Sequence, residues 1–531
     1  MDLSAAITQW RVLLGDSHVV LGEAVMLTYG NDTSGVQRRI PAALRIENSS
    51  SLQEVMRIAD RNQVPVYPIS TGKNWGYGGA LPARDDCVIL DLSPLTKILD
   101  FDEEFGVVTL EPGVTQGMLA HFLDAGNHPY MVPVTGAGPS CSLVGNALER
   151  GYGITPEGDH FAAVTDLEAV LPDGSLYRTA LREAGGQELA RLFKWGIGTY
   201  STGLFTQGGF GIVTRLSIIL KRKPECVKVC FFGVNDDALL EPAVSAIRAT
   251  LIKLPGTLAA INLMNQHRVL SMSAPYPLQQ LGEDGLIPAA VIQQLGRQYK
   301  ILPWTGFATM YGTNRVVAAA QKEMKAALSG IAKHLLFFTP ERAKTLRNLA
   351  KWIPGAAGKR VLRMTETLAQ SLELVAGRPN ETALPLAYWR YPKTQKELLK
   401  NPSQDGCGLI WYAPLVPMRP RDIRAYVDMV KRITRQHGME PLITFTSISD
   451  RLFDSTVPLL FERDNPSAVA AAQACYTDLL EAGRERGWFP YRVGIHSMQL
   501  LTSLQTDSKV FHARLRKDLD PHDLMAPGRY R

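Results

Sequence analysis

The first 220 residues alternate between helical and strand-like hydrophobic patterns. Apolar residues recur at helical spacing over 3–14 and again over 52–62. Ser51 and Glu54 stand three residues apart at the start of the second pattern, which predicts a capping box there. Short apolar runs bounded by glycine, proline and aspartate predict strands at 64–68, 87–92, 107–110, 167–171, 176–178 and 212–220.

The pattern changes at about residue 225. Longer strand-like runs now alternate with helical stripes, as in the helix expected over 421–435. Strands are predicted at 226–234, 257–263, 304–311, 409–415 and 442–447, with further helices at 236–253 and 314–328. This recurrence predicts an α+β unit built on one antiparallel sheet. For residues 330–400 we expect helices and loops.

Composition and charge limit the classes of protein to which this chain can belong. A chain of 531 residues is too long for one hydrophobic core, so two or more domains are expected. The formal net charge of +6 is spread without a long basic block, so neither nucleic acid nor a membrane is expected as a partner. The six cysteines form no CxxC pair, which favours reduced thiols in the cytoplasm. The N-terminus has no secretory pattern, and the ten histidines show no spacing typical of a metal site.

Glycine clusters are the main candidates for chemistry. The first, residues 70–79, has four glycines in eight positions directly after a short apolar run. Glycine lets successive backbone N–H groups converge on an anion, so this loop is suited to the pyrophosphate of a dinucleotide cofactor. A second small-residue loop follows at 135–140 and leads into 145–153, and a third lies at 207–211. The GxGxxS string at 196–201 has no preceding strand, which argues against a Rossmann site.

Taken in order, these motifs resemble the vanillyl-alcohol oxidase / p-cresol methylhydroxylase flavoproteins. The resemblance spans nearly the whole chain and is carried by 70–79, 145–160, 203–214, Tyr491-Arg492 and Ala526-Pro527-Gly528-Arg529. It implies an FAD-binding domain of two α+β subdomains over 1–224. It also implies a cap domain with a large antiparallel sheet over 225–485 and a C-terminal segment, 486–531, that returns to the FAD domain.

The resemblance also implies which residues bind FAD. In the family, an arginine or lysine in the position of Arg529 lies beside the flavin N1 and C2 carbonyl, where a cation stabilises the reduced flavin. The other expected contacts are Ser70, Thr71, Gly72, Lys73, Asn74, Gly76, Tyr77, Gly78, Gly136, Gly138, Ser140, Gly145, Asn146, Gly153, Ile212 and Val213. Residues 405–408 contain no histidine or tyrosine where some relatives tether the flavin, so we expect non-covalent FAD unless Cys407 or another residue substitutes.

Four residues match the catalytic positions of the family. Tyr77, Tyr491 and Arg492 correspond to the groups that bind a phenol oxygen and favour the phenolate. Asp159 corresponds to the acidic residue near flavin N5, with an acid–base role. The structural alternatives are a packed aromatic for Tyr491, an ion pair for Arg492 and a turn aspartate for Asp159, and the adjacent histidine is expected to be structural.

The resemblance implies a hydride-abstracting oxidoreductase for para-substituted phenols that works through a quinone methide. Residues 447–451 differ from the paired histidines of relatives, which leaves the substrate open. One alternative is an oxidase or dehydrogenase of a non-phenolic alcohol or specialised metabolite. Another is an electron-transfer subunit that works with a cytochrome. The electron acceptor is expected to be O₂ or a redox protein, and a homodimer is expected because relatives are usually built from dimers.

Overall fold

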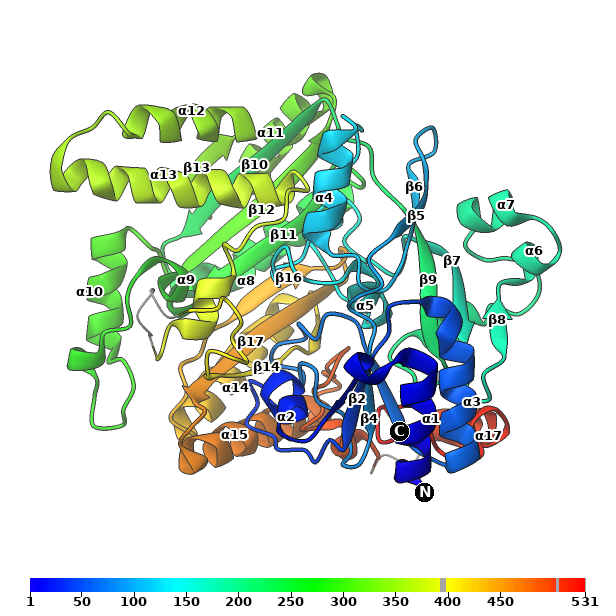
Figure 1. Ribbon diagram of the computed structural model, residues 1–531. Coiled ribbons are helices and arrows are strands. Elements are labelled where there is room, and N and C mark those ends of the chain that lie inside the picture. The colour runs from blue at the N-terminus through cyan, green and yellow to red at the C-terminus, as the bar shows by residue number, and fades with distance from the viewer. Residues whose placement is uncertain (392–397, 503–505, 531) are drawn as a thin grey trace.

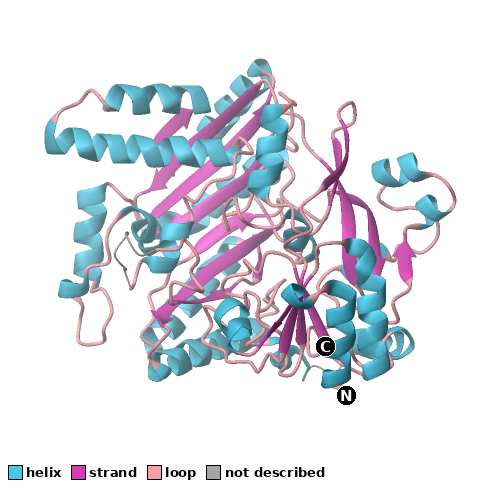
Figure 2. Ribbon diagram, viewed as in Figure 1, coloured by secondary structure: helices cyan, strands magenta, loops and turns pink. Residues whose placement is uncertain are grey.

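The structure is a computed structural model that describes residues 1–391, 398–502 and 506–530. Figure 1 shows two smaller sheets beside one large sheet, and Figure 2 shows helices packed around each of them. The smaller sheets use only strands before residue 220, and the large one uses strands between 226 and 462. The predicted α+β class is confirmed.

The first sheet has four strands in the order β1 (Val19–Leu21), β2 (Ala42–Arg45), β4 (Val88–Asp91) and β3 (Val66–Ile69). β3 lies at the edge, as expected of a strand with prolines in and before it. Helices α1 (Leu3–Leu14) and α3 (Leu52–Asn62) pack together, and the indole of Trp10 donates to the Val55 carbonyl at 3.1 Å. Between β1 and β2 lies α2 (Glu23–Tyr29).

The predicted capping box is wrong, although the helix it introduces is confirmed. Ser51 ends a 3-10 turn over Ser49–Ser51, and its hydroxyl donates to the Asn48 carbonyl at 2.8 Å instead of accepting from α3. The Asn48 side chain caps this turn by accepting from the Ser50 N–H at 3.1 Å. Asparagine therefore initiates the turn three positions earlier than the serine pattern suggests.

The second sheet is antiparallel, in the order β5 (Ile98–Asp102), β6 (Val107–Leu110), β9 (Ile212–Ile219), β7 (Val164–Val170) and β8 (Leu176–Arg178). The hairpin of β7 and β8 agrees with the sequence prediction. Helices α4 (Gln116–Ala125) and α5 (Leu143–Leu148) come between β6 and β7 in the chain. The short helices α6 (Ala180–Glu183) and α7 (Gln187–Leu192) follow β8.

The third sheet has eight antiparallel strands. Its order is β13 (Lys333–Phe338), β10 (Cys226–Val234), β12 (Trp304–Gly312), β11 (Leu258–Asn265), β16 (Thr444–Ser447), β17 (Leu452–Glu462) and β14 (Cys407–Tyr412), while β15 (Leu415–Pro417) pairs with β17. One face packs in an apolar core with α8 (Leu240–Lys253), α11 (Asn314–Ala327), α14 (Pro420–Gln436) and α15 (Pro466–Glu485). Further helices are α9 (Gln266–Ser273), α10 (Ala289–Tyr299), α12 (Pro340–Ala350) and α13 (Gly355–Val375).

Two strands of this sheet were not anticipated. β13 lies within 330–400, so the expectation of helices and loops alone is wrong there, and 392–397 fall outside the described residues. β17 is the longest strand of the sheet and lies near one end of it, next to β16. Because β17 pairs with β14, β15 and β16, it joins β14 and β15 to the rest of the sheet.

The C-terminal segment completes the first sheet. After α16 (Met498–Thr502) and α17 (Asp507–Leu519), the Val66 N–H donates to the Leu524 carbonyl at 2.8 Å. The Ala526 N–H donates back to the Val66 carbonyl at 2.8 Å, and Met525 is fully buried in the core of this sheet. Across the described ranges, the helices include none with the length and apolar character required to cross a bilayer.

Candidate active site

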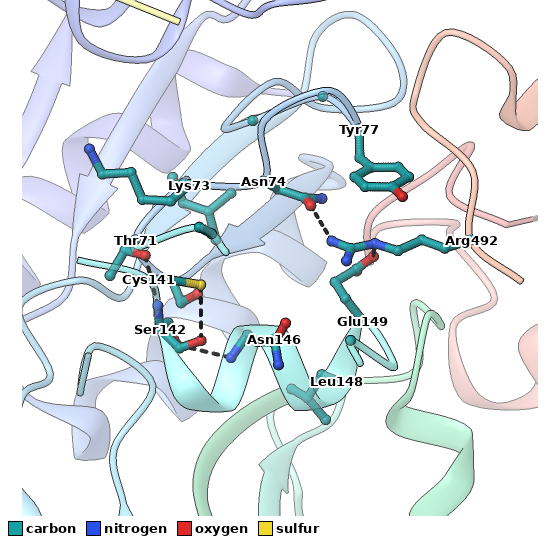
Figure 3. Close-up of a pocket in the computed structure, with 18 of the residues that line it drawn as sticks. Thr71, Lys73, Asn74, Tyr77, Cys141, Ser142, Asn146, Leu148, Glu149 and Arg492 are labelled. Carbon is teal, nitrogen blue, oxygen red and sulfur yellow. Dashed lines mark hydrogen bonds and ion pairs between the residues drawn. The ribbon is translucent and has the colours of Figure 1, made fainter. Parts of the chain in front are cut away.

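A cavity of about 390 Å³ lies between the glycine loop, the second sheet and the large sheet. Figure 3 shows its polar lining, in which residues of the glycine loop face residues of α5 and Arg492. Chain segments far apart in sequence meet here, including the loop after β3, the start of β9, the strand β14 and the C-terminal segment.

The first two glycine-containing loops are fixed to each other. The Ser142 N–H donates to the Thr71 hydroxyl at 3.2 Å, which joins the loops directly (Figure 3). The Ser142 hydroxyl donates to the Pro112 carbonyl at 2.6 Å and accepts from the Gly145 N–H at 2.9 Å, and so caps α5. This network holds the backbone on both sides of the cavity.

Two glycines permit contacts that a side chain would block. A Cβ on Gly145 would lie 2.3 Å from the Ser70 hydroxyl oxygen, so the loops meet at van der Waals distance only because this residue is glycine. A Cβ on Gly76 would lie 2.2 Å from the Trp411 ring, and its φ of +77° also favours glycine. These loops therefore present backbone rather than side chains, as a dinucleotide cradle requires.

The structure brings most of the predicted residues into one lining. Those that line the cavity are Ser70, Thr71, Gly72, Lys73, Asn74, Tyr77, Gly78, Gly136, Gly145, Asn146, Ile212, Val213, Tyr491, Arg492 and Arg529. Gly76, Gly138, Ser140, Gly153 and Asp159 do not. Gly76 supports the loop from behind, since its N–H donates to the Thr33 hydroxyl at 2.8 Å.

Arg492 is held on three sides. Its guanidinium carbon lies 4.3 Å from the centre of the Tyr77 ring, a cation–π contact, and its Nη2 donates to the Asn74 side chain (Figure 3). Its Nε lies 3.4 Å from a carboxylate oxygen of Glu149, which also pairs with Arg529. Glu149, which sequence reasoning missed, therefore links the predicted substrate-binding arginine to the predicted flavin-binding arginine.

The tyrosines of the site are neutral donors. Burial raises the pKa of Tyr77 well above its ordinary value of 10, although the nearby Arg492 charge lowers it. Burial, and then the charge of Asp454, raises the pKa of Tyr491 in the same way. The Tyr491 ring packs edge to face on Tyr152, with centroids 5.3 Å apart. At neutral pH these hydroxyls keep their protons and can donate them in hydrogen bonds.

Asp454 is the titratable group that sequence reasoning missed. It lies on β17 opposite Thr446, is 5% exposed, and its Oδ1 has no hydrogen-bond partner among the described residues. Burial raises its pKa from 3.8 to about 7, against the lowering effect of Arg492. An aspartate between apolar and β-branched residues in the run 452–462 was the signal that could have identified it. Asp454 does not itself line the cavity, but its charge acts on Tyr77, Tyr152 and Tyr491, so this carboxyl group with its raised pKa is a candidate for proton transfer.

Asp159 does not line the cavity, although its backbone pairs with Tyr152, whose ring packs on Tyr491. Its carboxylate accepts from the Ala162 N–H at 3.0 Å, which is the geometry of a turn. The neighbouring His160 is buried, burial lowers its pKa to about 4, and its Nδ1 lies 2.5 Å from the Asn146 side-chain nitrogen. This neutral histidine positions Asn146, which lines the cavity.

Comparison with known proteins fits this geometry. Residues 40–180 match the family described as FAD binding domain. The chain is 32% identical to 1'-carboxy-chondrochloren decarboxylase of Chondromyces crocatus, over 99% of this chain and 97% of that protein. It is 26% identical to the 4-cresol dehydrogenase [hydroxylating] flavoprotein subunit of Pseudomonas putida, over 99% and 95% of the two chains.

The chain belongs to the vanillyl-alcohol oxidase / p-cresol methylhydroxylase family of flavoproteins. The solved structure of p-cresol methylhydroxylase with substrate bound superposes with a TM-score of 0.86 at 26% identity, covering 100% of this chain and 96% of that one. The 4-ethylphenol oxidase from Gulosibacter chungangensis, in complex with isoeugenol, has the same fold. Its TM-score is 0.88 at 23% identity, with coverage of 100% and 97%.

This flavoprotein is therefore an FAD-dependent oxidoreductase that acts on CH or CH–OH groups. The glycine cradle and the cations Lys73 and Arg529 fit FAD, because they offer backbone N–H groups and positive charge to a polyanion. Bound FAD supplies the hydride acceptor. Cys407 is buried in β14 and does not line the cavity, whereas Cys141 does.

Proposed function

We propose that this flavoprotein abstracts a hydride from the benzylic carbon of a para-substituted phenol, either an alkylphenol or a benzylic alcohol. The observation that carries the proposal is the Arg492 guanidinium over the Tyr77 ring, 4.3 Å from its centre, in a cavity that Tyr491 also lines. Two neutral hydroxyl donors and one fixed cation stabilise a phenolate more than a phenol. Ionising the phenol promotes hydride loss, because the phenolate oxygen donates electron density through the ring to the benzylic carbon as the hydride leaves it.

The proton of the phenol needs an acceptor. Asp454, whose pKa is about 7 and whose Oδ1 lacks a hydrogen-bond partner among the described residues, is suited to take it. The same carboxyl group could then return a proton or accept one from a water that adds to the quinone methide. Asp159 remains the second candidate for this acid–base role, on the strength of its match to the family position.

A second reaction is supported by the decarboxylase among the relatives. If the substrate carries a carboxylate on the carbon next to the benzylic carbon, hydride loss and CO₂ release together form a carbon–carbon double bond. The protein 32% identical over 99% of this chain is named as a decarboxylase, which favours testing this class. Two further alternatives are a non-phenolic alcohol as substrate and an electron-transfer role with a cytochrome, since another relative is named as a flavoprotein subunit.

Anaerobic flavin reduction tests the proposal. The enzyme would be mixed with para-alkylphenols, para-hydroxybenzyl alcohols and their methyl ethers, and the flavin absorbance followed. Bleaching by the phenols but not by the ethers is the expected result, because an ether cannot form a phenolate. Bleaching by neither, together with bleaching by simple alcohols, would contradict the phenol proposal.

The same experiment can also identify the products and the electron acceptor. A ¹³C label in the carboxyl group of a carboxylated phenol separates the two reactions, since only decarboxylation releases labelled CO₂. Admitting air afterwards measures reoxidation by O₂, and slow reoxidation would favour a redox protein as acceptor. A homodimer in the cytoplasm is the assembly and compartment we propose, and light scattering of the purified holoenzyme tests the dimer.

A further inference from the structure

Helices α12 (Pro340–Ala350) and α13 (Gly355–Val375) form a hairpin that reaches past the edge of the large sheet (Figure 1, upper left). Only part of it packs on the sheet. Ala343, Ala369 and Leu372 are buried in a core cluster with Val229 of β10. The connection at 351–354 and the helix ends next to it extend beyond that contact, and we call residues 346–364 the hairpin tip.

The hairpin tip exposes large apolar side chains. Trp352 is 87% exposed, the highest value among the exposed large apolar residues of the described chain. Five more lie on the two helices and their connection: Leu346, Leu349, Ile353, Val361 and Met364. Contiguous exposed apolar residues of this size mark an interaction surface rather than ordinary surface scatter.

Positive charge accompanies these apolar residues. Residues 340–364 contain seven lysines and arginines against one glutamate, a formal net charge of +6. The whole chain also has a formal net charge of +6, so the remaining residues are formally neutral. The described Arg342, Lys344, Lys351 and Lys359 are exposed, and none of these four forms a salt bridge with another described residue.

We propose that the hairpin tip docks on an anionic lipid surface. Apolar side chains with a tryptophan among them, set between lysines and arginines, match the two forces that hold peripheral proteins on membranes. These are insertion at the headgroup boundary and attraction to anionic lipids. A second copy docked tip to tip is a poorer occupant, because that two-fold interface would bring two surfaces of the same charge together. Nucleic acid would use the cations but leave Trp352, Leu349 and Ile353 exposed.

This inference does not depend on the proposed reaction. It differs from the expectation drawn from the sequence alone, which found no long basic block. Apart from the adjacent Lys359 and Arg360, the lysines and arginines of 340–364 are separated by other residues, so no long basic run is visible in the sequence. The helical hairpin gathers both kinds of residue on one projection.

Vesicle co-sedimentation of the full-length holoenzyme tests the proposal. We expect binding to phosphatidylcholine vesicles that contain phosphatidylglycerol, weak binding to phosphatidylcholine alone, and loss of binding at high salt. Lys351→Ala should weaken binding by about fivefold, the contribution of one cation near an anionic surface. Trp352→Ser should weaken it by about tenfold, through loss of buried apolar area.

Two matched variants serve as controls. Trp195→Ser removes another tryptophan that is 61% exposed, after α7, and Arg421→Ala removes an exposed arginine at the start of α14. Neither should change vesicle binding. The flavin absorbance spectrum of each variant verifies that it is folded.

Three results would overturn the proposal. The first is equal binding by wild type and Trp352→Ser. The second is a wild-type protein that does not bind the vesicles but forms a dimer, which the Trp352→Ser substitution dissociates. The third is salt-sensitive binding to duplex DNA without vesicle binding.

Discussion

The Arg492 guanidinium lies over the Tyr77 ring, with 4.3 Å between the guanidinium carbon and the ring centroid. Arg492 comes from the C-terminal part of the chain and Tyr77 from the loop after β3, so the contact joins segments more than four hundred residues apart. The glycine loop thus lines the cavity with Gly72 and Gly78, while its Tyr77 packs on the Arg492 guanidinium.

Replacing this cation tests the phenolate site. Arg492→Met keeps a side chain of similar length but removes the charge, and should lower the rate of flavin reduction by a phenol about 100-fold. Arg421→Met, at the exposed start of α14, is the matched control and should leave the rate unchanged. Stopped-flow absorbance under anaerobic conditions measures both. A rate for Arg492→Met within twofold of wild type would remove Arg492 from the proposed chemistry.

Asp454 should give the reaction its pH dependence. Because its pKa is about 7 and the base must be ionised, the rate of flavin reduction should rise with pH through that value and level off above it. Asp454→Asn should lose this step in the pH profile. Asp159→Asn distinguishes the two candidates, since it should retain the step if Asp454 is the base and lose it if Asp159 is.

The same carboxyl group should affect stability. Its pKa is raised on folding, so between pH 3.8 and about 7 the folded protein binds more protons than the unfolded chain. Its contribution to stability is therefore full at low pH and is lost as pH rises through 7. Asp454→Asn, which stays neutral, should melt a few degrees higher relative to wild type at pH 8 than at pH 5. A melting-temperature difference that does not change with pH would contradict a neutral, buried Asp454.

Because the two loops are closely packed, a larger side chain at their contact should weaken FAD binding. In Gly145→Ala the new methyl would lie 2.3 Å from the Ser70 hydroxyl oxygen, which should weaken FAD binding about tenfold. Adding Ser70→Ala removes that oxygen and should restore most of the affinity. Gly158→Ala is the control, because its methyl would meet only the Gly153 carbonyl at 3.5 Å. Titration of apoprotein with FAD measures all four.

Acid precipitation tests how the flavin is attached. We expect the yellow colour in the supernatant, since the prediction is non-covalent FAD. Cys141→Ser adds a control, because this thiol lines the cavity. Colour in the wild-type pellet that Cys141→Ser abolishes would identify a thioether instead.

Sequence patterns predicted six of the nine strands of the two smaller sheets, because these are short apolar runs bounded by glycine, proline or aspartate, but they missed β1, β2 and β5. The strands β13 and β17 of the large sheet were harder to predict from the sequence. Lys333, His334 and Glu462 interrupt the ends of these strands, and β17 carries Asp454 in its interior. Its partners come from β14, β15 and β16, and such long-range pairing is not encoded in local periodicity.

In the candidate site, too, local sequence predicted some features but not those that depend on long-range contacts. Backbone contacts were predictable because glycine is required for them, as at Gly145. Asp454 and Glu149 were missed because their importance comes from burial and from the neighbours they meet, Arg492 above all. Asp159 matched a family position in sequence, yet its carboxylate accepts a local backbone hydrogen bond.

The hydrogen bonds between Val66 and residues 524–526 have a consequence for biosynthesis. The glycine loop starts four residues after Val66, but Arg529, which also lines the cavity, is translated more than 450 residues later. A nascent chain on the ribosome therefore lacks part of the binding site, however early its first sheet forms. FAD should therefore bind with full affinity only after residues 524–529 have been synthesised and have paired with Val66.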